Sequence, residues 1–480
     1  MKIWIGMCLA AVGIAQTPCE RLGNLKLPDT TITAAATVAA GPARGTVLPA
    51  YCRVAAVLTP SADSHIEMEL WMPVADWNGK FEAVGNGGWA GSINFAGMAA
   101  ALRESYATAS TDTGHKSSET PGGSFALGHP EKLIDYGYRA IHEMTVKSKA
   151  IIAAFYATEL KLSYWNGCSN GGRQGLMEAQ RYPDDFGGIV AGAPAANWTG
   201  RASQSMAVAQ ASHQEEGSLI PPAKFAMVHS AVMQACDKLD GVVDGILQDP
   251  VRCQFNPAVL QCKGGDGPDC LTAGQVETAR KIYMRLEPGS EAGWATYGGA
   301  KPFGIGEDHF KYVVFRNPSW DFRTLNADAD ATLAEKIDGG TINALNPDLR
   351  AFFAKGGKLI QYHGWSDPQI APMHSVKYYE SVLKAMGGAA KVGDSYRMFM
   401  VPAMGHCSGG PGPDQFNAMG ALERWREGGA APDQIVAAHV SNNKVDMTRP
   451  LCPYPQVAEY KGKGSTSDAG NFVCRVPKMK

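Results

Sequence analysis

The stretch that decides the fold is Tyr164-Trp165-Asn166-Gly167-Cys168-Ser169-Asn170-Gly171-Gly172-Arg173, which places the pattern G-x-S-x-G around Ser169. A strand-like run at residues 160–165 precedes the motif, and a helical pattern at residues 173–181 follows it. In a strand–turn–helix of this kind, the serine lies on a strained turn where side chains at the flanking positions would clash. The order of these elements predicts that Ser169 is a nucleophile. The alternative is an ordinary glycine-rich turn with a capping serine.

A serine nucleophile needs a base, and the base needs a carboxylate that orients it. In hydrolases built on such a turn, the acid and then the histidine follow the serine, each on a loop after a strand. Asp367 comes after the strand-like residues 358–362, and His406 lies in the turn after residues 396–401. We therefore predict that Ser169, Asp367 and His406 form a catalytic triad.

Other histidines fit this order less well. Four of them precede the serine in the chain: His65, His115, His129 and His142. His363 precedes the acid, His374 is expected to open a helix, and His439 lies inside a late strand. The competing interpretation of His406 is a surface or core histidine, and that of Asp367 is a turn-forming Asp-Pro pair.

Strand-like and helical segments alternate over most of the chain. The strand-like runs include residues 51–59, 66–72 and 81–84, and a helical pattern covers residues 130–154. This alternation predicts an α/β protein with a mostly parallel sheet that helices cover on both faces. The alternation stops from residue 201 to 345, where helices lie among Gly-, Asp- and Cys-rich loops. We therefore expect a core in two parts, residues 16–200 and 346–480, with an inserted cap (lid) at residues 201–345.

Residues 1–15 combine one lysine with an apolar run and small residues near its end. The run is shorter than the roughly 20 apolar residues that a membrane span needs, and it predicts a secretory signal peptide rather than a buried N-terminal strand. We expect a secreted or periplasmic protein without membrane attachment after cleavage. The 44 Lys and Arg against 46 Asp and Glu give a net charge of −2, which indicates no general attraction to nucleic acid.

Ten of the 11 cysteines remain after the predicted signal, which contains Cys8, is removed. An even number in an exported chain indicates disulfides, although spacing alone does not give their connectivity. No C-x-x-C pair occurs, which disfavours a thiolate zinc site of the usual spacing. The ten are Cys19, Cys52, Cys168, Cys236, Cys253, Cys262, Cys270, Cys407, Cys452 and Cys474.

Two of these cysteines flank the predicted triad, Cys168 before Ser169 and Cys407 after His406. With the continuation G-C-S-N-G-G-R-Q-G, this doubled signature resembles the tannase/feruloyl esterase family of α/β-hydrolases, which includes the enzyme that hydrolyses mono(2-hydroxyethyl) terephthalate. The resemblance extends from about Gly23 to the C-terminus. It implies an α/β-hydrolase fold with a lid domain, and the disulfides Cys168–Cys407, Cys19–Cys52, Cys236–Cys253, Cys262–Cys270 and Cys452–Cys474.

An oxyanion hole needs two backbone donors. The N–H of Asn170, directly after the nucleophile, is one candidate. The second is expected from Gly88 or Gly87 in the Gly85-Asn86-Gly87-Gly88 turn, because glycines let the backbone approach the developing oxyanion closely. The alternative is that these residues form only a tight turn.

An acidic loop lies within the predicted lid. Cys236-Asp237-Lys238-Leu239-Asp240-Gly241-Val242-Val243-Asp244-Gly245-Ile246 brings carboxylates together with glycines that permit sharp turns. Closely spaced oxygen ligands suit Ca²⁺, although the EF-hand pattern is missing. The resemblance implies a structural calcium ion held by the side chains of Asp237, Asp240 and Asp244 and by the carbonyl groups of Val242 and Ile246. A solvated acidic turn is the alternative, and no organic cofactor is expected.

Together these residues predict a secreted serine carboxylic-ester hydrolase that forms an acyl-enzyme with esters of aromatic acids. By resemblance the acyl group is feruloyl, galloyl or terephthaloyl, and we favour a feruloyl esterase-like activity on a small aromatic ester. Aromatic residues between positions 294 and 322 either wall the acyl site or pack in the lid core, and we expect most of them in the core. Arg316 or Arg323 could meet a substrate carboxylate. The alternatives from other classes are a serine peptidase of the same fold and a non-catalytic binding protein.

Overall fold

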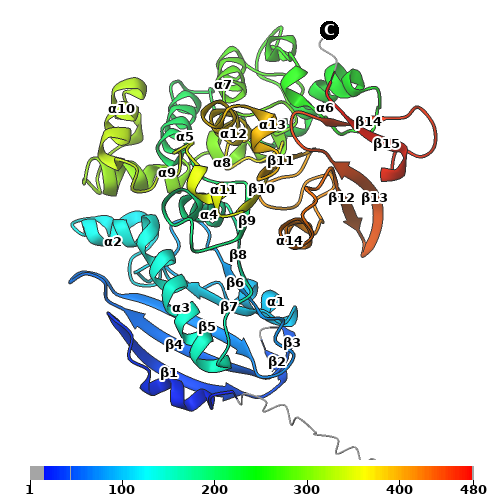
Figure 1. The fold of residues 1–480 in the computed structure, drawn as a ribbon. Helices are drawn as coiled ribbons and strands as arrows, with labels where there is room; N and C mark the ends of the chain where they lie inside the picture. The colour runs from blue at the N-terminus through cyan, green and yellow to red at the C-terminus, as the bar shows by residue number, and fades with distance from the viewer. Residues whose placement is uncertain (1–15, 44, 478–480) are drawn as a thin grey trace, which may run out of the picture.

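A computed structural model describes residues 16–43 and 45–477 (Figure 1), so the predicted signal peptide at residues 1–15 lies outside the described residues. Within these ranges, a nine-stranded sheet forms the centre of the fold. None of the described helices has an apolar stretch long enough to cross a membrane.

The sheet has an antiparallel edge and a parallel centre. In spatial order its strands are β1 (Thr30–Val38), β4 (Tyr51–Leu58), β5 (Ile66–Pro73), β7 (Ala107–Thr111), β6 (Lys80–Val84), β8 (Leu162–Cys168), β9 (Gly188–Gly192), β10 (Lys358–Gly364) and β11 (Tyr396–Val401). The pairs from β1 to β7 are antiparallel, and the pairs from β7 to β11 are parallel. Because parallel strands end at the same edge, the loops after β8, β10 and β11 come together there.

Burial along the strands follows their position in the sheet. All residues of β9 are buried, because helices cover both faces of the parallel centre. In β4, buried residues alternate with partly exposed ones from Arg53 to Leu58. This alternation is typical of a strand with one face less covered.

Helices cover both faces of the sheet. Those of the core are α1 (Phe95–Arg103), α2 (Pro130–Ile134), α3 (Ala140–Tyr156), α4 (Asn170–Arg181), α11 (Arg350–Ala354), α12 (Pro372–Met386), α13 (Ala389–Val392) and α14 (Ala418–Gly428). On one face, α3, α4 and α12 contribute Ile151, Leu176 and Val376 to a common apolar cluster with the sheet. On the other face, α1 and α14 contribute Ala101 and Leu422 to a second cluster.

Between β9 and β10 the chain leaves the sheet and forms a helical cap, which Figure 1 shows at the end of the molecule away from β1. Its helices are α5 (Trp198–Ser212), α6 (Phe225–Cys236), α7 (Ala273–Tyr283), α8 (Ala295–Gly298), α9 (Gly304–Asp308) and α10 (Ala327–Asp338). Val228, Val276 and Trp294 are buried in one cluster of the cap. The predicted cap boundary at residue 201 falls inside α5, which begins at Trp198.

Short hairpins and disulfides complete the fold. The hairpins pair β2 (Gly41–Ala43) with β3 (Thr46–Leu48), β12 (Ile435–Ser441) with β13 (Lys444–Leu451), and β14 (Val457–Tyr460) with β15 (Phe472–Arg475). The disulfide pairs implied by the resemblance are confirmed: Cys19–Cys52, Cys168–Cys407, Cys236–Cys253, Cys262–Cys270 and Cys452–Cys474.

Some predicted element boundaries differ from the structure. The strand predicted at residues 160–165 occupies Leu162–Cys168, and the following helix begins at Asn170, three residues earlier than predicted. The helical pattern at residues 130–154 consists of α2, a π-helical turn at Asp135–Arg139 and α3. The nucleophile turn is therefore tighter than the sequence pattern indicated.

Candidate active site

Ser169 lies between the end of β8 and the start of α4. Its backbone has φ +64° and ψ −121°, a strained conformation that L-residues rarely adopt. The turn is held by hydrogen bonds on both sides. The N–H of Ser169 donates to the carbonyl of Gly192 (2.9 Å), and the N–H of Ala195 donates to the carbonyl of Ser169 (3.1 Å). A strand–turn–helix of this kind presents the serine hydroxyl above the edge of the sheet.

Close packing of backbones explains the glycines beside Ser169. A Cβ atom at Gly167 would lie 2.6 Å from the carbonyl carbon of Gly171, and one at Gly85 would lie 2.5 Å from the Cα of Gly171. Both distances are shorter than a carbon–carbon contact allows. The glycine turn at residues 85–88 therefore packs directly against the nucleophile turn.

The predicted acid and base are hydrogen-bonded to each other. Nδ1 of His406 lies 2.7 Å from Oδ2 of Asp367. Asp367 is fully buried, and its other oxygen accepts from the N–H groups of Gln369 (2.7 Å) and Ile370 (3.0 Å). Burial acts to raise the pKa of Asp367, but hydrogen bonds from His363 and His406 outweigh it and hold the pKa below its ordinary value. The carboxylate is therefore ionised at neutral pH and can orient an imidazole.

A disulfide joins the residue before Ser169 to the residue after His406. Cys168 and Cys407 are bonded, with Cα atoms 6.0 Å apart, although the two residues are 239 positions apart in the chain. Cys407 has φ +64°, so the chain turns sharply directly after the histidine. The covalent link holds the histidine turn beside the nucleophile turn.

Ser169 and His406 line one cavity of about 830 Å³. The glycine turn lines the same cavity, and a Cβ atom added at Gly87 would meet no other atom within 4 Å. Asn170 opens α4 directly after Ser169, so its N–H belongs to the helix N-terminus, where negative charge is favoured. Of the two predicted sources of oxyanion donors, Gly88 lines the cavity and Asn170 directly follows Ser169.

A buried polar network supports this region, and the sequence analysis missed it. Nε of the fully buried Arg173 donates to Oδ1 of Asn170 (2.7 Å). The hydroxyl of Tyr136 donates to the carbonyl of Gly88 (2.9 Å) and also reaches Oδ1 of Asn170 (3.2 Å). Tyr136 thereby links the glycine turn to the start of α4. Arg173 stands in the quoted motif, but nothing in the motif points to Tyr136.

The cavity also holds a carboxyl group that the sequence analysis did not single out. Glu82 on β6 lines the cavity and accepts a hydrogen bond from Nδ2 of Asn166 (3.1 Å). Burial raises the pKa of Glu82 to about 7, against the effect of the bond from Asn166. Near neutral pH this group can therefore donate or accept a hydrogen bond in the cavity.

One of the histidines that were alternatives to His406 also contacts the predicted acid, but from the buried side. Nε2 of His363 lies 3.1 Å from Oδ2 of Asp367, and its Nδ1 lies 2.7 Å from Oγ of Ser375. His374 lies in the first turn of α12, and His439 lies in β12. In the part of the chain that the structure describes, none of these three lines the cavity that holds Ser169.

Comparison with known proteins decides the family. The family model described as "Tannase and feruloyl esterase" matches residues 52–332 and 303–475. An uncharacterised esterase of Xanthomonas campestris pv. campestris is 38% identical over 539 aligned residues, which cover 97% of this chain and 93% of that protein. This chain belongs to the tannase and feruloyl esterase family.

Further family members agree with this assignment. A probable feruloyl esterase B-2 of Aspergillus fumigatus is 35% identical over 486 residues, covering 94% of this chain and 90% of that protein. The crystal structure of feruloyl esterase B from Aspergillus oryzae has a TM-score of 0.90 at 31% identity, covering 95% of this chain and 99% of that chain. Tannin acyl hydrolase from Aspergillus niger shares the fold, with a TM-score of 0.77 at 22% identity and coverage of 96% and 93%. The predicted α/β-hydrolase fold and carboxylic ester hydrolase class are confirmed.

In this esterase, aromatic residues between positions 294 and 322 contribute to the core of the cap. Trp294 is fully buried there, and Phe310 and Trp320 stack with ring centroids 5.2 Å apart. Arg316 and Arg323 are exposed, and neither lines the cavity of Ser169 among the residues described. Their positions do not support the contact with a substrate carboxylate that the sequence analysis considered.

The cap approaches the glycine turn of the esterase through α9. A Cβ atom at Gly88 would lie 3.8 Å from Cδ1 of Ile305. His309 follows α9 and stacks on Trp89, with ring centroids 6.3 Å apart. The cap therefore contacts the segment that holds one predicted oxyanion donor.

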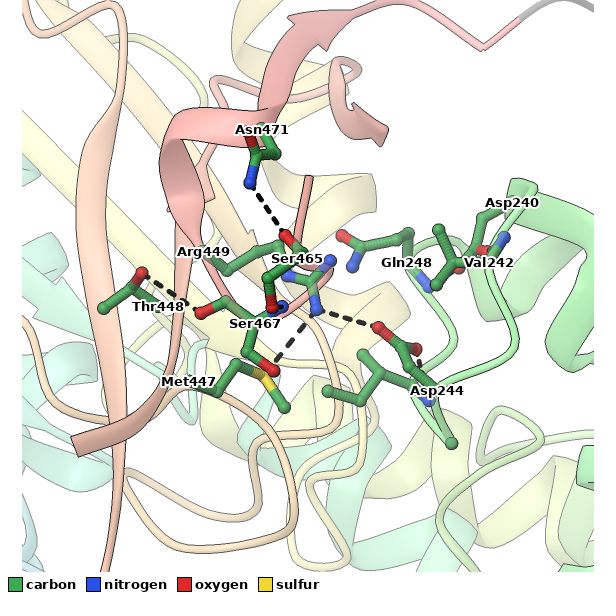
Figure 2. A network of polar contacts seen from close by, with 12 residues as sticks. Asp240, Val242, Asp244, Gln248, Met447, Thr448, Arg449, Ser465, Ser467 and Asn471 are labelled. Carbon is green, nitrogen blue, oxygen red and sulfur yellow. Dashed lines mark hydrogen bonds and ion pairs between the residues drawn. The ribbon is translucent and has the colours of Figure 1, made fainter. Parts of the chain in front are cut away.

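The acidic loop of the cap lies against the C-terminal hairpins, as Figure 2 shows. Nη2 of the buried Arg449 on β13 lies 2.9 Å from Oδ2 of Asp244. Val242 packs in one apolar cluster with Cys452 and Phe472. The loop thus connects the cap to the last part of the chain.

The chemistry of the acidic loop fits a hard divalent cation. Burial raises the pKa of Asp240 to about 6, and the charges of Asp244 and Asp237 add to this effect. Across residues 16–43 and 45–477, however, the three carboxylates do not form a group with oxygen atoms within 4.8 Å of one another. They accept backbone hydrogen bonds instead, Asp237 from Gly245, Asp240 from Val242 and Gln248, and Asp244 from Ile246. The carboxylate and carbonyl oxygens of the loop are ligands that suit Ca²⁺. In the structure, Asp244 pairs with Arg449.

Proposed function

We propose that this protein is an exported serine esterase of the feruloyl esterase type, with Ser169 as nucleophile, His406 as base and Asp367 as orienting acid. The observation that carries the proposal is the 2.7 Å hydrogen bond between His406 and Asp367 on a turn that a disulfide ties to the nucleophile turn. Ser169 and His406 line the same cavity. A strained serine, followed in the chain by a buried acid and then by a base, supplies the parts that acyl transfer requires.

In the proposed acylation, His406 takes the proton of the Ser169 hydroxyl as Oγ bonds to the ester carbonyl carbon. The carbonyl π electrons move to its oxygen, and the N–H groups of Asn170 and Gly88 donate to this oxyanion. When the tetrahedral intermediate collapses, the ester C–O bond breaks and His406 gives its proton to the leaving alcohol. Water then attacks the acyl-enzyme by the same route and releases the acid.

For the substrate we propose esters of hydroxycinnamic acids, with galloyl esters and mono(2-hydroxyethyl) terephthalate as the alternatives. Support comes from the 35% identity to a protein named as a probable feruloyl esterase B-2, and from the TM-score of 0.90 with feruloyl esterase B. The tannin acyl hydrolase is more distant, at 22% identity. A cavity of about 830 Å³ is in the range that holds a small aromatic ester.

Export is part of the proposal. The signal-like run at residues 1–15 begins the chain, and five disulfides follow it. Disulfides persist in oxidising compartments and are rare in the cytosol. These two features together support a secreted or periplasmic enzyme.

We also propose that the acidic loop binds a structural Ca²⁺. The ligands would be the side chains of Asp237, Asp240 and Asp244 and the carbonyl groups of Val242 and Ile246. The ion would supply the positive charge that offsets the clustered carboxylates. No catalytic step proceeds through it.

Labelling with a fluorophosphonate, followed by a substrate panel, tests the proposed function. We expect the parent enzyme and the exposed-serine control Ser319→Ala to form the adduct, and Ser169→Ala to lose it. Among methyl ferulate, methyl gallate, mono(2-hydroxyethyl) terephthalate and matching amides, we expect methyl ferulate to give the highest kcat/KM. An adduct that persists in Ser169→Ala would overturn the nucleophile assignment, and preferred amide turnover would identify a peptidase.

A further inference from the structure

Three side chains that commonly bind metals meet between α3, α4 and the turn that leads into β9. His142, Glu178 and Asp185 offer ligand atoms that all lie within 4.8 Å of one another. Nδ1 of His142 lies 2.6 Å from Oδ2 of Asp185. Glu178 is eight residues beyond Asn170 on α4, which places it about 12 Å along the helix from the nucleophile turn. The cluster is therefore separate from the catalytic cavity.

Glu178 is the residue of this cluster whose surroundings indicate a binding site. The residue is 1% exposed, and apart from the neighbouring Asp185 carboxyl group neither of its oxygens has a hydrogen-bond partner among the residues described. Burial raises the pKa of Glu178, and both the charge of Asp185 and a carboxyl–carboxylate hydrogen bond with it raise that pKa further. A buried carboxylate of this kind needs either a proton or a cation that it shares with its neighbours.

A neighbouring lysine does not supply that cation. Nζ of Lys149 donates to the backbone carbonyls of Asp184 and Asp185, not to the carboxylates of the cluster. Burial lowers the pKa of Lys149, against the attraction of Asp185 and Glu178. Lys149 therefore forms no direct ion pair with the carboxylate of Glu178 or of Asp185.

The third group, His142, is held in place and can be reached from solvent. Its ring stacks on Tyr182, with centroids 3.7 Å apart and an angle of 8° between the planes. Its side chain is 28% exposed, which gives an ion a route into the cluster. Two ligands lie on helices and one on a short turn, so the backbone positions them before any ion binds.

We propose that His142, Glu178 and Asp185 bind one divalent transition-metal ion of the zinc class, with water as the fourth ligand. One imidazole nitrogen and two carboxylates suit tetrahedral Zn²⁺, whereas Ca²⁺ prefers oxygen ligands alone. An ion bound at Nδ1 of His142 would leave the ring proton on Nε2. The ion joins α3 to α4 and to the turn before β9.

Metal analysis of the full chain tests this proposal. The protein is stripped with a chelator, returned to Ca²⁺ to fill the acidic loop, and dialysed against Zn²⁺ before its zinc content is measured. We expect one equivalent of zinc in the parent and loss of that equivalent in Glu178→Gln and His142→Ala. Co²⁺ in place of Zn²⁺ is expected to give the visible absorption of a tetrahedral site in the parent and not in Glu178→Gln.

The matched control is His129→Ala, which removes a surface histidine that pairs with Asp63 (3.0 Å). We expect it to retain the zinc equivalent. Glu178→Gln preserves the volume of the side chain and stays neutral, and the partly exposed His142→Ala replaces it if the buried variant does not fold. A folded parent that binds no more zinc than Glu178→Gln would overturn the proposal and assign Glu178 as a protonated acid beside Asp185.

Discussion

Nε2 of His363 lies 3.1 Å from Oδ2 of Asp367, the same oxygen that accepts from His406. The proposed catalytic acid is thus contacted by two imidazoles, one at the cavity and one fully buried. The buried ring is itself fixed, because its Nδ1 lies 2.7 Å from Oγ of Ser375. The two hydrogen bonds outweigh burial and keep the pKa of Asp367 low. His363 is therefore a positioning residue for the acid.

The change His363→Gln tests this relationship. We expect kcat on the preferred ester to fall roughly 10- to 100-fold, because a hydrogen bond to a charged group contributes about 1.5–3 kcal/mol. The folded pKa of Asp367 lies below its unfolded value of about 3.9, so its carboxylate stabilises the fold above about pH 4. That contribution is lost as the pH falls through the folded pKa.

In His363→Gln the folded pKa of Asp367 moves upward. The deficit in the free energy of unfolding should therefore be full at neutral pH and shrink as the pH falls below about 4. Urea unfolding from neutral pH to below about pH 4 measures this deficit in the free energy of unfolding, and His439→Gln is the control. Unchanged kcat, or a deficit that is constant across the range, would contradict the positioning role.

Removing the Cys168–Cys407 disulfide tests whether this bond positions the triad in addition to stabilising the fold. The double change Cys168→Ser and Cys407→Ser should lower the free energy of unfolding by about 2–5 kcal/mol. It should also lower kcat by roughly 100-fold in the molecules that remain folded, because small displacements of reacting groups are costly. The matched control is Cys262→Ser with Cys270→Ser, a cap disulfide that closes a loop of 8 positions. Equal kcat in the two double variants would show that the triad does not depend on the tether.

The packing of the nucleophile turn predicts that Gly167→Ala is not tolerated. Its Cβ would lie 2.6 Å from the carbonyl carbon of Gly171, so one of the two backbones must move. We expect a loss of about 1–3 kcal/mol in stability and a larger loss of fluorophosphonate labelling. Gly428→Ala at the end of α14 is the control, since a Cβ there meets no atom within 4 Å. Normal labelling of folded Gly167→Ala would disprove the close packing.

How well the sequence predicts a site residue depends on whether a local sequence pattern or a contact between distant segments of the chain determines its position. Ser169 could be picked out as the candidate nucleophile because strand, turn and helix follow one another over residues 160–181, and each has its own local pattern. Asp367 and His406 could be picked out as candidates because parallel strands end at one edge of the sheet. The disulfide pairs came from the family resemblance, since spacing left their connectivity open.

Side-chain contacts between elements that are far apart in the chain have no local sequence pattern, so they could not be predicted. Tyr136 reaches Gly88 and Asn170 only because the π-helical turn packs over both. Arg449 and Asp244 are 205 positions apart, and their ion pair depends on how the cap docks on β13. The same holds for His142, Glu178 and Asp185, which tertiary packing brings together. Local patterns specify elements, whereas side-chain partners depend on the packed structure.

Asp240 in the acidic loop is expected to lower the stability of the fold as the pH rises, whereas Asp367 is expected to raise it. The folded pKa of Asp240 is about 6, above its unfolded value of about 3.9, so its ionisation in the fold costs stability. This cost is absent below about pH 4, grows as the pH rises and is complete above about pH 6. In chelator, Asp240→Asn should therefore gain stability relative to the parent over that interval.

Calcium should reverse the order of stability of the parent and Asp240→Asn. At neutral pH, Ca²⁺ should raise the Tm of the parent because the ion offsets the clustered carboxylates, and it should raise the Tm of Asp240→Asn less. Asp269→Asn, an exposed aspartate of the cap, should respond like the parent. Thermal unfolding with and without chelator gives all of these values. If Ca²⁺ shifted the parent and Asp240→Asn equally, the ion would bind elsewhere, and if it shifted neither, the loop would be a solvated acidic turn whose charges are balanced only by Arg449.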